Sequence, residues 1–210
     1  MLKVYYANID PLRDEAHFLQ RMELIQPERR EKIEKLKAKE EQLRGLAAGL
    51  LLRIALEEEG MDYGKQEFFY GEHGKPCLLH QSMHFNMSHA GNYAVCSVSD
   101  QPIGVDVEVI TRLDGKKDQV RRIADRILTE PEQDFWHEHG ATEAELLKIW
   151  TRKESYAKMR GIGLSIGLEN IDTIGGAAFY SMQPDETHYV TVCTECACEK
   201  AQIFNKTDNL

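Results

Sequence analysis

A helix with charged residues on its apolar face constrains the fold of this chain more than any other feature. Residues 146–160 contain neither proline nor glycine, so they predict a helix that ends at Gly161. At about 100° per residue, one stripe of this helix is apolar and is formed by Leu146, Ile149, Trp150, Tyr156 and Ala157. Lys153 falls in the middle of the stripe, and Glu154 and Lys158 share one of its flanks.

Two interpretations of these charges are open. In the first, Glu154 and Lys158 form an i,i+4 ion pair on a solvated edge, and Lys153 extends its ammonium group to water along its apolar stem. In the second, this face borders a cleft that binds a charged ligand, because unpaired charges in an apolar setting are costly and tend to mark functional sites.

Composition narrows the class of protein. The 210 residues are 42% hydrophobic and 29% charged, which is ordinary for a globular chain with a real core. We expect a cytoplasmic protein without membrane contact, because no apolar stretch could span a bilayer and the N-terminus has no signal pattern. Five cysteines suggest reduced thiols. The net charge of −9 argues against nucleic-acid binding, so a polyanionic ligand would need a local basic patch.

The order of patterns predicts an α+β fold of two pseudo-symmetric halves, each a small, mostly antiparallel sheet packed with helices. Residues 1–9 read as a strand, and 27–59 as one long helix or two helices that meet near Gly45. Three short strands follow between 85 and 110, and helical patterns resume from 116. We expect the halves to be residues 1–100 and 101–210.

A strand with two carboxylates on one face follows the middle of the chain. In IGVDVEV, the apolar residues alternate with Asp106 and Glu108. Taken alone, this pattern favours a half-buried strand with a polar outer face. The alternative is a pair of oxygen ligands for Mg²⁺, which one or two carboxylates usually hold together with substrate phosphates. Glu154 would suit the same site, with Lys153 and Lys158 beside a bound diphosphate.

The motifs together resemble one family. IGVDVE, WTRKESYAK and GIGLS are similar to the paired signature of the 4′-phosphopantetheinyl transferases, specifically the double-length type that activates surfactin synthetase. PERREK, the arginine of QLRG, GEHGKP and FNMSHAG resemble that family in the same order. The resemblance extends from about residue 25 to residue 168. It implies the fold of that family and a monomer with coenzyme A in the cleft between its halves.

The resemblance also implies roles for individual residues. Asp106, Glu108 and Glu154 would hold Mg²⁺, and Glu154 would take the proton from a carrier-protein serine. Lys158 would assist the departing 3′,5′-ADP, and Lys153 would contact a phosphate. The remaining contacts to coenzyme A would come from Arg29, Lys32, Arg44, Lys75, Pro76, Ser88 and His89. Arginine at 29 replaces a more usual lysine, and Glu132 corresponds to a glutamate discussed as an accessory base.

The implied reaction converts an acyl, peptidyl or aryl carrier protein from its apo to its holo form. Two alternatives use the same residues: a coenzyme A diphosphate hydrolase, and an inactive module that binds coenzyme A without turnover. The basic run at 116–126 is either a solvated helix face or a docking surface for an acidic carrier protein.

Overall fold

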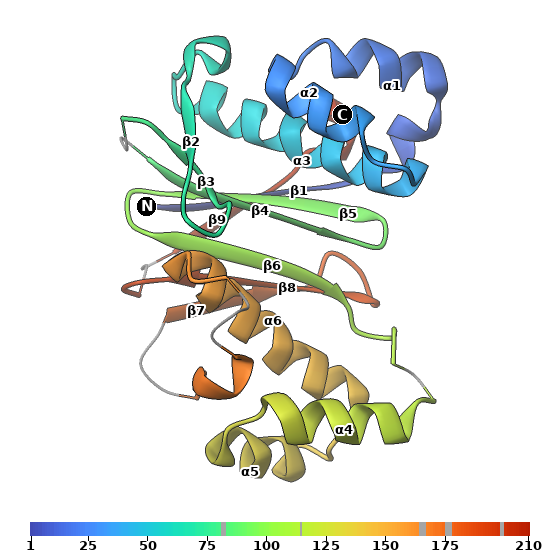
Figure 1. Cartoon of the computed structure of the whole chain (residues 1–210), viewed down its shortest axis with the longest axis vertical. Coiled ribbons are helices and arrows are strands. Elements are labelled where there is room, and N and C mark those ends of the chain that lie inside the picture. Colours follow the sequence, from blue (N-terminus) through green and yellow to red (C-terminus); the bar gives the residue numbers. More distant parts are fainter. Residues whose placement is uncertain (81–82, 114, 164–166, 175–177, 198–199) are drawn as a thin grey trace.

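The computed structural model describes residues 1–80, 83–113, 115–163, 167–174, 178–197 and 200–210. Its mixture of helices and small sheets confirms the predicted α+β class (Figure 1). The helices are α1 (Glu15–Met22), α2 (Pro27–Glu34), α3 (Lys39–Glu58), α4 (Lys117–Ile127), α5 (Glu130–Glu138) and α6 (Glu143–Arg160). The strands are β1 (Leu2–Asn8), β2 (Phe68–Tyr70), β3 (Pro76–Leu78), β4 (His84–Ala90), β5 (Tyr93–Ser99), β6 (Ile103–Val109), β7 (Ala178–Met182), β8 (His188–Thr194) and β9 (Ala201–Asn205).

The first sheet has the strand order β4-β5-β1-β9, in which β9 runs parallel to β1 and the other pairs are antiparallel. Helices α1 to α3 cover one face of this sheet, with α3 directly on it (Figure 1). The apolar residues of α3 pack against the sheet, and most of them are fully buried. The short β2–β3 hairpin lies beside this half, and Gly74, with φ 80°, permits the tight turn between its strands.

The second sheet has the order β6-β8-β7 and is antiparallel throughout. Helix α6 packs on β6 and β8, and α4 and α5 pack at its far end (Figure 1). The predicted helix stop is confirmed, because Gly161 has φ 67° and caps α6 in the left-handed conformation.

Gly104 sets the close approach of β6 to α6. A Cβ at this position would lie 2.0 Å from the carbonyl oxygen of Ser155 and 2.3 Å from the amide nitrogen of Met159. Asp106 and Glu108 follow at intervals of two residues, so they share with Gly104 the face that meets α6. The missing side chain therefore brings the two carboxylates within reach of the charged residues on the helix.

The Gly104→Ala variant is expected to lower the free energy of unfolding by about 3 kcal/mol, at the upper end of overpacking costs, because rigid backbone atoms cannot yield to the new methyl group. Urea unfolding followed by circular dichroism measures this change. Gly64→Ala is a suitable control, since its Cβ would meet only Asp62 Oδ1, at 3.4 Å. Equal stability of Gly104→Ala and the wild type would contradict this account of the packing.

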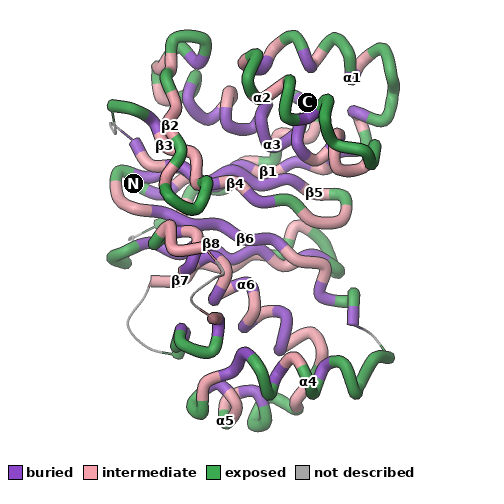
Figure 2. The backbone as a smooth tube through the Cα atoms, viewed as in Figure 1, coloured by how far each residue is buried: buried purple, intermediate pink, exposed green. Residues whose placement is uncertain are grey.

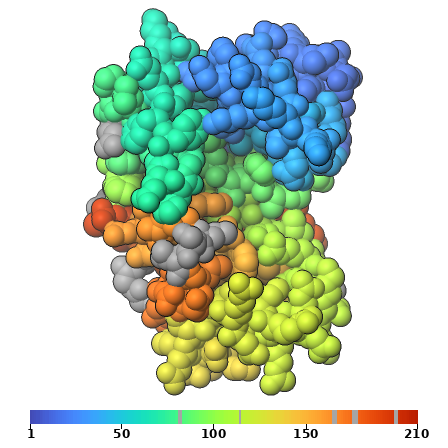
Figure 3. Space-filling view, viewed as in Figure 1, coloured from blue at the N-terminus to red at the C-terminus, as the bar shows by residue number. Residues whose placement is uncertain are grey.

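The two sheets pack face to face through an apolar cluster between the halves. Figure 2 shows that the strands on both sides of this junction are largely buried. The first sheet contributes Leu2, Val4 and Val95, and the second contributes Ile103, Val105, Val107, Val190 and Val192. Edge strands β4 and β6 also meet, and there the Asn86 side chain accepts a hydrogen bond from Val105 N at 2.9 Å. In the space-filling view, the two halves meet across the middle of the molecule (Figure 3).

Two details differ from the local pattern. The break between α2 and α3 falls at residues 35–38, whereas Gly45 lies inside α3 against Ile33. Strand β9 joins the first sheet, so the segment predicted as the second half, 101–210, includes a strand that pairs with β1. None of the helices among the described residues has the length and apolar character needed to cross a membrane.

Candidate functional site

A cavity of about 600 Å³ opens at the seam between β4 and β6. Most residues that the motifs single out line it: Arg29, Lys32, Pro76, Ser88, His89, Asp106, Glu108, Glu154 and Lys158. They come from α2, β3 and β4 of the first half and from β6 and α6 of the second. The cavity is therefore built by both halves of the chain, and positive and negative side chains face each other across it.

Lys158 lies at the centre of a polar network in this cavity. Its ammonium group donates to Asp106 Oδ1 at 2.6 Å and to Ser88 Oγ at 2.9 Å. Ser88 Oγ also donates to Asp106 Oδ1 at 2.9 Å and accepts from Val107 N at 3.4 Å. The ion pair of Lys158 thus reaches across to β6, which supports the second interpretation of the helix charges, a face that borders a cleft.

The carboxylates of the cavity disfavour one another's ionised forms. Burial raises the pKa of Glu108 to about 7, and the negative charges of Asp106 and Glu154 act in the same direction. Burial and the charge of Asp106 also raise the pKa of Glu154, whereas Lys158 opposes the rise. A cation bound among these groups would relieve this repulsion.

The donor set fits a magnesium ion that is shared with a ligand. In the part of the chain that the structure describes, no three His, Cys, Asp or Glu side chains are close enough to form a metal site by themselves. Mg²⁺ does not require such a cage, since phosphate oxygens and water usually complete its octahedron. Asp106 Oδ2 is buried without a hydrogen-bond partner among the described residues, so this oxygen can coordinate a bound cation.

Basic residues gather at the end of the cavity formed by the first half. Arg29 is packed against α3, and its Nη2 donates to Gly45 O at 3.2 Å. Burial lowers the pKa of Arg29, and its Nε is buried without a hydrogen-bond partner among the described residues. Lys32 is exposed, and its Nζ lies 3.6 Å from the centroid of the Tyr70 ring. An anionic group bound here would stabilise both cations.

A second cavity, of about 340 Å³, adjoins the first, and both are lined by Met87, Glu154 and Lys158. Lys75 lines only this second cavity, and burial lowers its pKa. The Lys75 ammonium group donates to Ile103 O at 2.9 Å and to Met159 O at 3.1 Å, so it connects the hairpin to β6 and α6. In the GIGLS motif, residues 164 and 165 lie outside the described residues.

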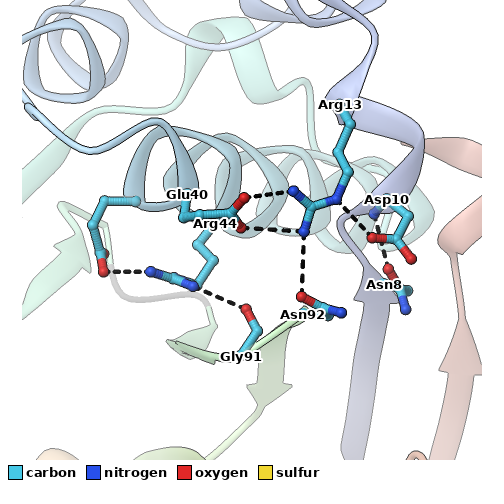
Figure 4. Close-up of polar contacts among 8 residues, drawn as sticks. Asn8, Asp10, Arg13, Glu40, Arg44, Gly91 and Asn92 are labelled. Carbon is cyan, nitrogen blue, oxygen red and sulfur yellow. Dashed lines mark hydrogen bonds and ion pairs between the residues drawn. The ribbon is translucent and has the colours of Figure 1, made fainter.

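The structure does not bring Arg44 to either cavity. Its guanidinium group donates to Gly91 O at 2.9 Å and pairs with Glu41, which fixes α3 against the turn between β4 and β5 (Figure 4). Arg13 connects the same region through Glu40 and Asn92 (Figure 4). The contacts of Arg44 are therefore those of a residue that supports the hairpin carrying Ser88 and His89.

The predicted phosphate contact of Lys153 is wrong in this structure. Its side chain is 0% exposed and forms an ion pair at 2.5 Å with Glu132, which is also 0% exposed. Lys153 Nζ further donates to Leu168 O at 2.9 Å and to Ile171 O. The Lys153 ammonium group does not reach water either, so the interpretation in which it extends to solvent is also wrong for this residue.

Glu132 has too many structural partners for the role of accessory base that the resemblance suggested. Its Oε1 accepts from Thr173 N at 3.0 Å and from Thr173 Oγ1 at 2.7 Å, and its Oε2 accepts from Thr129 N at 2.9 Å. Glu132 lines neither cavity. The Glu132–Lys153 pair instead joins α5 and α6 to the segment around 168–173.

Sequence reasoning missed two polar residues of the larger cavity. Arg112 pairs with Glu108 at 2.8 Å, and Tyr70 lies under Lys32. The i,i+4 spacing of Glu108 and Arg112 indicates an ion pair only if the backbone turns directly after the strand, because residues four apart in an extended strand lie far from each other. Tyr70 lies in a short aromatic run of β2, where nothing in the sequence distinguishes a core residue from an exposed one.

Comparisons with known proteins agree with this geometry. A family model described as the 4′-phosphopantetheinyl transferase superfamily matches residues 102–191, and one described as 4′-phosphopantetheinyl transferase, N-terminal, matches residues 10–101. A 4′-phosphopantetheinyl transferase of Bacillus subtilis is 32% identical over 177 residues, which cover 80% of this chain and 75% of the relative.

Two further relatives have the same kind of name. The 4′-phosphopantetheinyl transferase Sfp of Bacillus subtilis strain 168 is 31% identical over 174 residues, which cover 80% of this chain and 75% of the relative. The 4′-phosphopantetheinyl transferase AcpT of Salmonella typhi is 32% identical over 139 residues, which cover 61% and 67% of the two chains. With its motifs gathered in one cavity between two halves, this chain belongs to the 4′-phosphopantetheinyl transferase family.

Proposed function

We propose that this protein transfers the 4′-phosphopantetheine arm of coenzyme A to a serine hydroxyl of an acyl, peptidyl or aryl carrier protein, with Mg²⁺ as its metal. The observation that carries the proposal is the cavity in which Asp106, Glu154 and Lys158 lie together, in a chain of this family. The carboxylates of this cavity would hold a metal ion, and Lys158 supplies a positively charged side chain; the two together would neutralise a bound diphosphate.

In the transfer, the serine oxygen attacks the phosphorus atom that bears the pantetheine arm. The bond from that phosphorus to the bridging oxygen breaks, and 3′,5′-ADP leaves. Glu154 accepts the serine proton, directly or through water, because its carboxylate lines both cavities. Lys158 donates to the oxygens that gain negative charge as the diphosphate separates.

Asp106, Glu108 and Glu154 are the residues that would hold Mg²⁺, which would neutralise charge on the diphosphate. Lys158 and Ser88 fix the orientation of Asp106 by hydrogen bonds to its Oδ1, and this leaves Oδ2 for a ligand. Since the raised pKa of Glu154 reflects burial and the nearby Asp106, a bound cation favours the ionised form that can accept a proton.

The nucleotide part of coenzyme A is assigned to the basic end of the cavity. Arg29 and Lys32 approach it from α2, and His89 and Pro76 line it from β4 and β3. These cations supply the local positive charge that the overall net charge of −9 lacks. The adjoining cavity, with Ala157, Gly161 and Met87 in its lining, lies on the other side of Glu154 and suits the less charged pantetheine arm.

Helix α4 is the proposed docking surface for the carrier protein. Val120, Ala124 and Ile127 face the core, and Arg121, Arg122 and Arg126 are exposed. An acidic partner would meet this basic face. We propose that the protein acts as a monomer, because one chain supplies both sides of the cavity. We also propose that it acts in the cytoplasm.

Replacing Asp106 by asparagine is expected to raise the Mg²⁺ concentration for half-maximal transfer about tenfold or more, since this residue offers its second oxygen to the metal. The maximal rate should fall in the same variant. A titration of the initial rate with Mg²⁺ measures both quantities. A variant with the metal titration of the wild type would remove Asp106 from the metal site.

The hydrolase alternative is not favoured by the relatives, which are named transferases. It predicts release of 3′,5′-ADP from coenzyme A and Mg²⁺ in the absence of any carrier protein. The proposed transferase should release 3′,5′-ADP only when an apo carrier protein is present. Chromatographic measurement of 3′,5′-ADP with and without the carrier distinguishes the two reactions, and release without a carrier at the same rate would overturn the proposal.

A further inference from the structure

Arg112 lines the larger cavity beside Glu108 and Glu154, and the chemistry proposed above gives it no role. Strand β6 ends at Val109, and Arg112 N donates to Val109 O at 3.1 Å. The backbone therefore turns immediately after the strand. This turn directs the Arg112 side chain back along β6 to the residue four positions earlier.

Two contacts fix the Arg112 side chain. Its Nη1 lies 2.8 Å from Glu108 Oε1, and its guanidinium carbon lies 5.5 Å from the centroid of the Trp150 ring. Trp150 belongs to α6 and precedes Glu154 by one helical turn. Arg112 thus connects the strand that carries Glu108 to the helix that carries Glu154.

The pair is more than a solvated surface contact. The Glu108 side chain is only 13% exposed, although that of Arg112 is 39% exposed, so the carboxylate is shielded from water, whereas ion pairs with both partners in water contribute little. The planar guanidinium group can bind a carboxylate and stack on an indole at the same time, which an ammonium group cannot do. The Arg112 contact engages Oε1 of Glu108, and Lys158 likewise engages Oδ1 of Asp106. Each carboxylate of β6 is thereby held by one oxygen and can offer the other.

We propose that Arg112 is a positioning residue that orients the Glu108 carboxylate for a divalent cation and uses Trp150 as its platform. The inference rests on the proposed function, because it assigns Glu108 to the metal. Groups that hydrogen-bond to metal ligands typically change metal affinity by about 10- to 100-fold when they are removed. Arg112 acts through Glu108 and does not touch the metal.

The test measures Mn²⁺ binding to the full chain with saturating coenzyme A and no carrier protein, by the electron paramagnetic resonance signal of free Mn²⁺. The Arg112→Gln variant should bind Mn²⁺ about 10- to 100-fold more weakly than the wild type. Arg112→Lys keeps the charge but not the planar stack, so it should recover only part of the loss. In a Glu108→Gln background, Arg112→Gln should cause no further loss, because the residue through which it acts is already changed.

Arg160→Gln is the matched control, because it removes an arginine that is 53% exposed and lies outside both cavities. It should bind Mn²⁺ like the wild type. Wild-type affinity in Arg112→Gln, full recovery in Arg112→Lys, or an additive loss in the double variant would each overturn the positioning role. If Arg112→Gln does not fold, as judged by circular dichroism, Arg112→Lys against the wild type decides the question. Absence of saturable Mn²⁺ binding in the wild type would instead contradict the proposed metal site.

Discussion

Replacing Glu154 by glutamine is expected to lower the rate of arm transfer roughly 100- to 10,000-fold, the range for loss of a general base. The amide cannot accept the serine proton, and it is also a weaker metal ligand than a carboxylate. Coenzyme A should still bind within a few-fold of the wild-type affinity, because Arg29, Lys32 and Lys158 remain. Isothermal titration calorimetry gives the affinity, and the rate of holo-carrier formation gives the transfer.

Glu145→Gln is the matched control for this prediction, since Glu145 lies on the same helix, pairs with Lys148 and lines neither cavity. It should transfer the arm at the wild-type rate. If Glu154→Gln also transferred at that rate, Glu154 would lose both of its proposed roles. Loss of coenzyme A affinity in proportion to the lost rate would instead make it a binding residue.

Replacing Lys153 by methionine is expected to lower the free energy of unfolding by about 3–5 kcal/mol, the usual cost of breaking a buried ion pair. The Glu132 carboxylate would remain buried without its cation, and the carbonyl groups of Leu168 and Ile171 would lose a donor. Chemical unfolding measures the change. Lys148→Met, which breaks a partly exposed pair with Glu145, should cost about 1 kcal/mol or less.

The double variant Glu132→Gln/Lys153→Met separates a structural role from a ligand contact. It removes both charges, and the glutamine oxygen can still accept from Thr173, so the stability should recover in part. Its affinity for coenzyme A should equal that of the wild type. A stable Lys153→Met protein with weak coenzyme A binding would return Lys153 to the phosphate contact that the family resemblance implied.

The sequence predicted which faces of β6 and α6 carry the charged residues of the larger cavity, because their spacing is local. The alternation in IGVDVEV places Asp106 and Glu108 on the face that meets α6, and the helical period places Glu154 and Lys158 on one flank of that helix. Once Gly104 allows the strand and the helix to approach, these four residues must line a common space.

What the sequence could not predict depends on partners that are far apart along the chain. The helical projection predicted the face of α6 on which Lys153 lies. How deeply its side chain is buried, and which group it pairs with, depend on where α5 places Glu132. The hydrogen bond from Thr129 N to Glu132 joins residues three apart in the sequence, whereas Thr173 lies 41 residues from Glu132. Strand β9 similarly pairs with β1 from the opposite end of the chain, a contact that no local pattern contains.

Intact mass spectrometry of carrier proteins tests the central claim most directly. A panel of apo acyl, peptidyl and aryl carrier proteins would be incubated with this protein, coenzyme A and Mg²⁺, with EDTA in a parallel sample. At least one carrier should gain the mass of one phosphopantetheine arm, and neither the EDTA sample nor a carrier whose acceptor serine is alanine should gain it. No gain on any carrier, while the protein still binds coenzyme A, would contradict the proposed transfer.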